Sequence, residues 1–276
     1  VKSLFVFAGL LFGHAWTDAI LVKQVLAAAV AFALVSSCIY VLNDIADRAA
    51  DRQHPVKRNR PLAKGSVSLN AAILLALFAG LSGAFLGYYA STTVAQLLAL
   101  YAILNIAYSA GLKRVPILDV FMIAAGFMLR LLAGTSGVGI PPSQWLLLCG
   151  LALTLFMGFV KRRAEMSGEV DLGSLQRPVL RHYSPLLLDQ LITISAAAIV
   201  MSYSLYTLSP ETIAKHGTSM LMVTVPCVIY GIFRYLLLLH QHRQGEDPAS
   251  DALRDPHLLV TALLWLGLTV WLIARD

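Results

Sequence analysis

The sequence contains few charged residues. Asp, Glu, Lys and Arg make up only 13% of the 276 residues, which is about half of their share in a typical soluble domain. The stretch of 48 residues from Gly65 to Leu112 contains none of these four types, and a bilayer core takes about 20 apolar residues per helix. The scarcity of charge therefore excludes a soluble enzyme and a disordered chain, and this stretch alone predicts two membrane-spanning helices.

Cysteine is scarce as well. Cys38, Cys149 and Cys227 lie within apolar stretches, and their spacing is not that of metal ligands. They predict buried thiols rather than a secreted disulfide scaffold or a zinc site. No small-residue cleavage pattern follows the first apolar run, so a cleavable signal peptide is not apparent. The chain begins with Val1 rather than Met, so we expect that the original N terminus is missing from this sequence or was trimmed.

Apolar runs separated by turn signals predict nine transmembrane helices. The predicted fold class is therefore an all-α, polytopic integral membrane protein, with a single domain over residues 1–276. The predicted spans lie near residues 3–16, 19–47, 67–89, 92–110, 115–134, 142–164, 184–207, 218–239 and 256–274.

Basic residues gather in alternate loops between these spans. Four loops hold fifteen of the 21 Lys and Arg residues, whereas the opposite side holds only Lys23, Lys215 and Arg275. The positive-inside rule places the four basic loops in the cytoplasm and predicts a multi-pass protein of the inner (plasma) membrane. Because these residues lie in loops next to lipid headgroups, the net charge of +6 does not indicate a nucleic-acid partner. The four loops are residues 48–66, 111–115, 161–183 and 240–256.

The second predicted span ends in a cluster of acids with the pattern N-D-x-x-D-x-x-x-D. If the helix continues, Asn43, Asp47 and Asp51 lie at i, i+4 and i+8 on one face, with Asp44 beside Asp47. Like charges this close repel one another unless a cation lies among them, and Mg²⁺ is commonly held by one or two carboxylates together with substrate phosphates. We therefore predict a catalytic Mg²⁺ site with Asp44, Asp47 and Asp51 as ligands and Asn43 beside them.

A basic loop follows the acids directly. Proline stops the helix, and Lys57, Arg58 and Arg60 are expected to project from a restrained loop. Guanidinium groups bind phosphate oxygens well, so the acids and this loop together predict a diphosphate site in two parts. Two alternatives stay open. The acids form a solvated helix end that pairs with Arg48 and Arg52, or the loop serves topology alone.

These motifs resemble those of the UbiA superfamily of intramembrane prenyltransferases. The resemblance covers essentially the whole chain and rests on the acidic pattern, the run His-Pro…Lys-Arg-x-Arg-Pro at residues 54–61, and the nine spans. Later motifs are similar to those of the branch of bacterial decaprenyl-phosphate phosphoribosyltransferases. These motifs include Tyr108-Ser109, Lys113, Asp119, Gly126-Phe127-x-Leu129-Arg130, Lys161-Arg162-x-Ala164-Glu165 and Arg234-Tyr235.

The resemblance implies that phosphoribose is transferred from phosphoribosyl pyrophosphate to a polyprenyl (decaprenyl) phosphate, with Mg²⁺ as cofactor and pyrophosphate as leaving group. The product would feed cell-wall arabinan synthesis, and the active site would face the cytoplasm. The chain lacks the second aspartate-rich motif that ring-prenylating members usually carry after the sixth span. One acidic cluster is enough for Mg²⁺ on the pyrophosphate, while separate cations are needed for the lipid phosphate and the ribose phosphate. The sequence leaves both a monomer and a homo-oligomer open.

Residues around the fifth span are further candidates for substrate contacts. Tyr108 ends the fourth span, and Lys113 precedes the fifth span and is assigned to phosphate binding. Asp119 is assigned to the metal or a ribose hydroxyl, with a Lys113–Asp119 salt bridge as the structural alternative. Arg130 lies deeper in the bilayer, and helix-end carbonyls or a carboxylate are favoured over a lipid phosphate as its partner.

Two further groups complete the predicted site. Lys161, Arg162 and Glu165 share the exit turn of the sixth span and are assigned to substrate binding, although Lys161 and Glu165 also have the spacing of an ordinary ion pair. Arg234 is either a ligand of the lipid phosphate or a snorkelling anchor. Two other functions stay open: a UbiA-type transfer of a prenyl group from prenyl diphosphate to an aromatic or quinone-precursor acceptor, and transport through the membrane.

Overall fold

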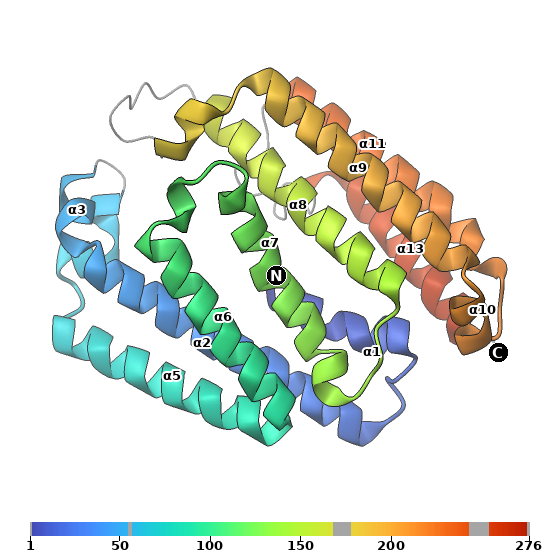
Figure 1. The fold of residues 1–276 in the computed structure, drawn as a ribbon, viewed down its shortest axis with the longest axis horizontal. Helices are drawn as coiled ribbons and strands as arrows, with labels where there is room; N and C mark the ends of the chain where they lie inside the picture. Colours follow the sequence, from blue (N-terminus) through green and yellow to red (C-terminus); the bar gives the residue numbers. More distant parts are fainter. Residues whose placement is uncertain (1, 55–56, 168–177, 243–253, 275–276) are drawn as a thin grey trace. The chain divides into compact units, whose positions relative to one another are not determined.

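The computed structural model describes residues 2–54, 57–167, 178–242 and 254–274 (Figure 1). Within these ranges the regular structure is entirely helical, which confirms the predicted all-α fold class. Parts of the predicted loops 48–66, 161–183 and 240–256 lie outside the described residues. Residues 161–166, which take the place of a second aspartate-rich motif, are described as the end of α8.

Eight helices within the described ranges are long and apolar enough to cross a bilayer, and they match eight of the nine predicted spans to within a few residues. The predicted first span corresponds to a shorter apolar segment, Ser3–Gly13. The eight are α2 (Ala19–Ala46), α5 (Leu69–Ala90), α6 (Thr92–Ala110), α7 (Leu118–Ala133), α8 (Gln144–Ser167), α9 (Pro185–Leu208), α11 (Val225–His242) and α13 (Pro256–Ala274).

Short helices connect the long ones. They are η1 (Lys2–Phe7), α1 (Ala8–Gly13), α3 (Arg48–Gln53), η2 (Lys57–Asn59), α4 (Pro61–Lys64), η3 (Leu112–Arg114), η4 (Ser136–Val138), η5 (Pro178–His182), α10 (Pro210–His216) and η6 (Met220–Thr224).

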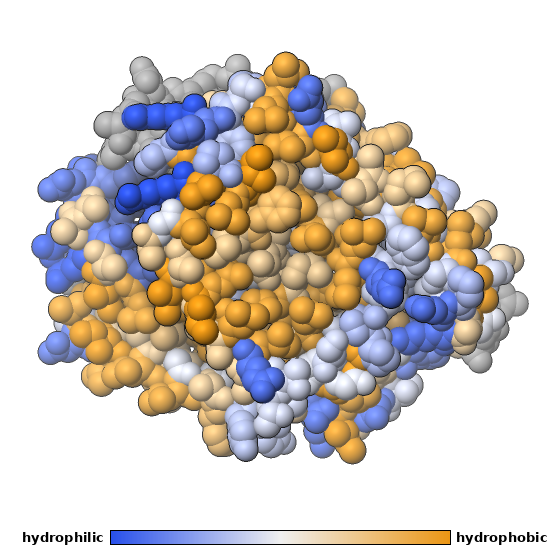
Figure 2. Space-filling view, in the orientation of Figure 1, coloured by the Kyte–Doolittle hydropathy of each residue, from blue (hydrophilic) through white to orange (hydrophobic). Residues whose placement is uncertain are grey.

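The outer faces of the long helices are apolar. Figure 2 shows apolar side chains over much of the surface in view. On α5, for example, Phe78, Leu81 and Phe85 are each exposed by more than two thirds. A soluble protein rarely exposes apolar patches of this extent, whereas lipid chains cover them without cost. The exposed surface thus agrees with a multi-span membrane protein.

Contacts between the helices divide the chain into two compact units. The N-terminal unit comprises Lys2–Lys113 and Leu129–Ile140, and the C-terminal unit comprises Arg114–Met128 and Pro141–Asp276. Each unit has its own hydrophobic core. The single domain expected over residues 1–276 stays a prediction.

In the N-terminal unit, α5 lies along α2 (Figure 1). The buried face of α5 consists of small residues, among them Ala72, Ala76, Ala79 and Gly83, which allow two helix backbones to approach closely. A methyl group at Gly83 would lie 2.8 Å from Cγ2 of Val35 on α2. This packing fixes the long helix whose end carries the acidic cluster.

In the C-terminal unit, α8 packs along α9, and α11 packs against α13. The core is formed by large apolar side chains, including Phe156 and Phe159 of α8 and Leu188 and Ile192 of α9. The packed core therefore fixes the end of α8, which carries the basic residues described below.

Candidate functional site

The helix that carries the acids breaks within the motif. α2 ends at Ala46, Asp47 has φ −87° and ψ 0°, and α3 begins at the next residue. Asp47 is exposed, whereas Asp51 is buried. The helix thus ends where the predicted span ends, near residue 47, and the single face that a continuous helix would give Asn43, Asp47 and Asp51 is interrupted at Asp47.

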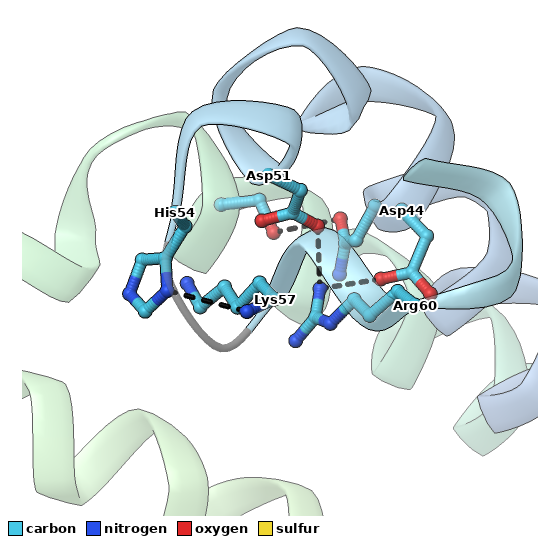
Figure 3. Close-up of polar contacts among 7 residues, drawn as sticks. Asp44, Asp51, His54, Lys57 and Arg60 are labelled. Carbon is cyan, nitrogen blue, oxygen red and sulfur yellow. Dashed lines mark hydrogen bonds and ion pairs between the residues drawn. The ribbon is translucent and has the colours of Figure 1, made fainter. Parts of the chain in front are cut away.

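Asp44 and Asp51 converge instead, and the guanidinium group of Arg60 lies between them (Figure 3). Nη1 of Arg60 donates to Oδ1 of Asp44 at 2.7 Å and to Oδ2 of Asp51 at 2.8 Å. The side chain of Asp51 is 5% exposed, while those of Asp44 and Arg60 are 37% and 41% exposed. A residue predicted to bind phosphate is thus paired with the acids.

The basic loop folds back onto α3 through two arginines. Nε of Arg48 donates to the carbonyl of Leu62 at 3.3 Å, and Nε of Arg52 donates to the carbonyl of Ala63 at 3.2 Å. These contacts tie α3 to α4. They also bind both arginines to backbone carbonyls, in place of the pairs with the aspartates that the solvated-helix alternative required.

Two cations of the loop remain exposed beside the acids. Lys57 and Arg58 have exposed side chains, and neither forms an ion pair within the described ranges. The backbone N–H of Lys57 donates to Nδ1 of His54 at 3.3 Å, which restrains the turn (Figure 3). Both side chains are therefore available to an anionic ligand.

The end of α6 contacts the acidic motif. Oγ of Ser109 donates to Oδ1 of Asn43 at 3.3 Å, and the neighbouring Tyr108 is half-buried. Lys113 follows in η3 with an exposed side chain. Sequence reasoning included Ser109 in a motif but gave it no role, because its contact joins residues 66 positions apart.

The Asp44–Asp51 pair has the donor chemistry of a magnesium site. Both oxygens bind the same nitrogen, so their separation is at most the sum of the two hydrogen-bond distances. Among the residues that the structure describes, no group of three or more His, Cys, Asp or Glu side chains is placed to hold a metal ion. Two carboxylates nevertheless suit Mg²⁺, which takes its remaining ligands from water and substrate phosphates. The residues therefore fit this ion once Arg60 withdraws.

A second charged cluster lies in the C-terminal unit, and its Asp119–Arg162 pair is fully buried. Nε of Arg162 donates to Oδ2 of Asp119 at 2.6 Å, and Nη1 donates to Oε2 of Glu165 at 2.7 Å. The side chains of Asp119 and Arg162 are 0% and 1% exposed. Asp119 thus pairs with Arg162 rather than with Lys113, and Glu165 pairs with Arg162. The ion pair between Lys161 and Glu165 at i, i+4 stays a prediction.

Sequence reasoning missed Tyr183, which joins this cluster and lies between η5 and α9. Its hydroxyl donates to Oδ1 of Asp119 at 2.8 Å and accepts the N–H of Ile117 at 2.5 Å. Burial raises the pKa of the Tyr183 phenol well above its ordinary value, so the hydroxyl keeps its proton. Ile117 has φ +68°, which is strained for a β-branched residue. The phenol thus fixes the turn that leads into α7.

Arg130 is buried and contacts side chains of the N-terminal unit, which agrees with the structural role that the sequence favoured. It is 4% exposed, and its Nη2 donates to Oγ of Ser36 at 2.7 Å and to the hydroxyl of Tyr101 at 2.9 Å. Cζ of Arg130 also lies 4.5 Å from the centre of the Tyr101 ring. Two hydroxyls and an aromatic face thus contact this guanidinium group.

Arg234 forms an ion pair that sequence reasoning did not foresee. It donates to both oxygens of Asp255, at 3.3 Å from Nε and 2.8 Å from Nη2. Asp255 also accepts the N–H of Leu258 at the start of α13. The hydrogen bonds from Arg234 hold the pKa of Asp255 below its usual range. Arg234 thus ties α11 to α13, and its predicted contact with a lipid phosphate stays a prediction.

Residues 3–254 match the model of the UbiA prenyltransferase family. The chain is similar to the decaprenyl-phosphate phosphoribosyltransferase of Mycolicibacterium smegmatis, with 34% identity over 250 residues that cover 88% of this chain and 78% of the relative. It is similar to the enzyme of the same name from Corynebacterium glutamicum, with 36% identity over 275 residues that cover 96% and 81%. It shares the fold of a UbiA homolog from Archaeoglobus fulgidus bound to GPP and Mg²⁺, with a TM-score of 0.70, 17% identity and coverage of 99% of this chain and 95% of that chain.

Proposed function

The chain belongs to the UbiA prenyltransferase family, and we propose that this membrane-embedded transferase moves phosphoribose from phosphoribosyl pyrophosphate to a polyprenyl phosphate such as decaprenyl phosphate. The observation that carries the proposal is the similarity to two enzymes named for this activity, at 34% and 36% identity over most of their length. The site supports it, because one convergent pair of carboxylates stands beside several cations. The product is proposed to supply cell-wall arabinan synthesis.

We assign the metal to the acidic end of α2. Asp44 and Asp51 would hold Mg²⁺, with Asp47 close by in the chain and Asn43 in contact with Ser109. When bound, Mg²⁺ neutralises the negative charge that develops on the leaving pyrophosphate. Magnesium appears in the description of the Archaeoglobus fulgidus homolog, and the oxygen donors of the present chain suit the same ion.

Four exposed cations are assigned to phosphate oxygens. Lys57 and Arg58 are exposed beside the Asp44–Asp51 pair and bind the pyrophosphate of the donor. Lys113 and Lys161 are exposed at the ends of their helices and are assigned to the remaining phosphates. Tyr108 and Arg234 stay proposed substrate contacts.

The transfer itself needs no general base. An anionic oxygen of the lipid phosphate forms a bond to C1 of the ribose while the bond from C1 to pyrophosphate breaks, and pyrophosphate leaves with both electrons. A phosphate monoester is already anionic near pH 7, so no proton has to be removed from the nucleophile. The protein contributes orientation and charge neutralisation.

We assign the Asp119 cluster to positioning rather than to substrate contact. Both oxygens of Asp119 already accept hydrogen bonds, from Arg162 and Tyr183, and Arg162 is 1% exposed. This arrangement fixes the end of α8, from which Lys161 projects and to which Glu165 is tied. The earlier assignment of Asp119 to the metal or a ribose hydroxyl is therefore replaced in this proposal.

The distribution of basic residues supports an orientation in which the catalytic loops face the cytoplasm of a plasma membrane. Both proposed substrates then meet at the inner surface, where a soluble donor and a lipid acceptor are available together. The polyprenyl tail remains in the bilayer beside the apolar helix faces.

A labelled-donor assay tests the proposed function. Purified protein in nanodiscs is incubated with phosphoribosyl pyrophosphate labelled on the 5-phosphate, decaprenyl phosphate and Mg²⁺. We expect a labelled lipid that disappears when the metal is chelated and when Asp51→Asn is assayed. The matched control is Asp18→Asn, at the opposite end of α2, where the side chain caps the helix and Asn caps equally well. Absence of labelled lipid, with product formed instead from a prenyl diphosphate and an aromatic acid, would overturn the proposal.

A further inference from the structure

One guanidinium nitrogen holds together the two acids of the proposed metal site. Nη1 of Arg60 lies 2.7 Å from Asp44 and 2.8 Å from Asp51 (Figure 3). Two carboxylates at this separation repel each other unless positive charge lies between them. In this structure Arg60 supplies that charge.

Arg60 and a divalent ion therefore require the same oxygens. The contact from Nη1 uses one oxygen of each acid, and these are the oxygens that face each other across the pair. Asp51 is 5% exposed, so little water reaches its carboxylate, and a cation beside it lowers the cost of burying a negative charge. A metal that binds these oxygens consequently has to displace the guanidinium group of Arg60.

The surrounding contacts allow the side chain of Arg60 to leave while its backbone stays in place. Arg48 and Arg52 bind the carbonyls of Leu62 and Ala63, just after Arg60 in the chain. The Arg60 side chain is itself 41% exposed, and it needs only a change of rotamer to point elsewhere. A diphosphate bound beside the acids offers oxygens that suit a displaced guanidinium group.

We propose that Arg60 is a positioning residue that makes metal binding depend on the phosphorylated donor. It neutralises Asp44 and Asp51 while the donor is absent, and it exchanges these carboxylates for diphosphate oxygens when metal and donor enter together. The inference rests on the metal site of the proposed function. By linkage, the donor then tightens metal binding by the same factor by which the metal tightens donor binding.

Metal affinity without any substrate tests this role. Mn²⁺ is titrated into the purified full chain in nanodiscs, and free Mn²⁺ is measured by electron paramagnetic resonance. Arg60→Gln removes the competing cation, and we expect Mn²⁺ to bind at least about tenfold more tightly than to the wild type. Lys64→Gln changes the net charge equally in the same loop, at an exposed residue, and is expected to change the affinity by less than about twofold.

Two further variants locate the effect. Asp51→Asn combined with Arg60→Gln is expected to lose the gained affinity, which shows that the metal occupies these acids. Arg60→Lys keeps a cation and should bind Mn²⁺ as weakly as the wild type, which tests the idea even if Arg60→Gln does not fold. Arg60→Gln protein that binds Mn²⁺ no more tightly than the wild type would overturn the inference and leave Arg60 as a structural brace.

This experiment separates the inference from the proposed function. It contains neither phosphoribosyl donor nor lipid acceptor, so its result does not depend on which group the enzyme transfers. A failed labelled-lipid assay with tight Mn²⁺ binding by Arg60→Gln would reject the substrates and retain the role of Arg60. The reverse pattern would retain the substrates and reject the role.

Discussion

Loss of the Asp119 charge should lower the free energy of unfolding, because Asp119 pairs with a buried arginine. Asp119→Asn keeps the shape of the side chain but leaves the Arg162 guanidinium, which is 1% exposed, without its carboxylate at 2.6 Å. Removing one partner of a buried ion pair costs about 3–5 kcal/mol of unfolding free energy. Glu165 still binds Nη1 of Arg162 at 2.7 Å, so we expect the lower end, about 3 kcal/mol.

The cost is measured as the free energy of unfolding in mixed micelles titrated with sodium dodecyl sulfate. The control is Asp189→Asn, whose ion pair with Arg163 at 2.9 Å is partly exposed, at 34% and 26%, and is expected to contribute less than about 1 kcal/mol. The combined change Asp119→Leu with Arg162→Met removes both buried charges and should recover part of the loss, because Glu165 and the Tyr183 hydroxyl then each lose a partner. Equal costs for the Asn variants of Asp119 and Asp189 would refute the reasoning that burial decides the energy.

Three other outcomes follow from the contacts described. Because the pKa of the Tyr183 phenol is raised in the folded protein, the neutral phenol stabilises the folded state fully below pH 10, and this contribution is lost as the pH rises further. The unfolding temperatures of the wild type and Tyr183→Phe should therefore approach each other above pH 10. Arg234 lowers the pKa of Asp255 from 3.8, so the ionised carboxylate stabilises the folded state above pH 3.8 and loses this effect only as the pH falls further. Asp255→Asn should therefore lower the unfolding temperature equally at pH 5 and pH 8. Tyr101→Phe removes an acceptor of Arg130 and should cost about 1 kcal/mol of unfolding free energy in micelles.

The transmembrane helices could be predicted because each one is fixed by local composition. Charge-free runs of about 20 residues have few alternatives in a membrane protein, and Ser68 and Ser91, which cap α5 and α6, mark helix starts that turn residues already indicated. The first span was predicted to reach residue 16 because apolar composition continues to Trp16, whereas the apolar segment in the structure is Ser3–Gly13. Composition does not detect the left-handed residue His14 that ends α1.

The site was predictable in its residues but not in its pairs. The acids, Arg60 and Arg162 were recognised by type and spacing, yet the partner of each depends on contacts between distant parts of the chain. Asp44 and Asp51 share Nη1 of Arg60, which lies 16 and 9 positions further along the chain, and Asp119 meets Tyr183 across 64 residues. Spacing along one helix describes neighbours within that helix and carries no information about such contacts.

A structure of the protein with Mn²⁺ and phosphoribosyl pyrophosphate, with the metal located by its anomalous scattering, tests the central claim most directly. The account predicts a metal peak between Asp44 and Asp51, with the Arg60 guanidinium group moved from the carboxylates to the diphosphate. Donor bound without a metal peak at these acids, and with Arg60 still paired to both, would contradict it.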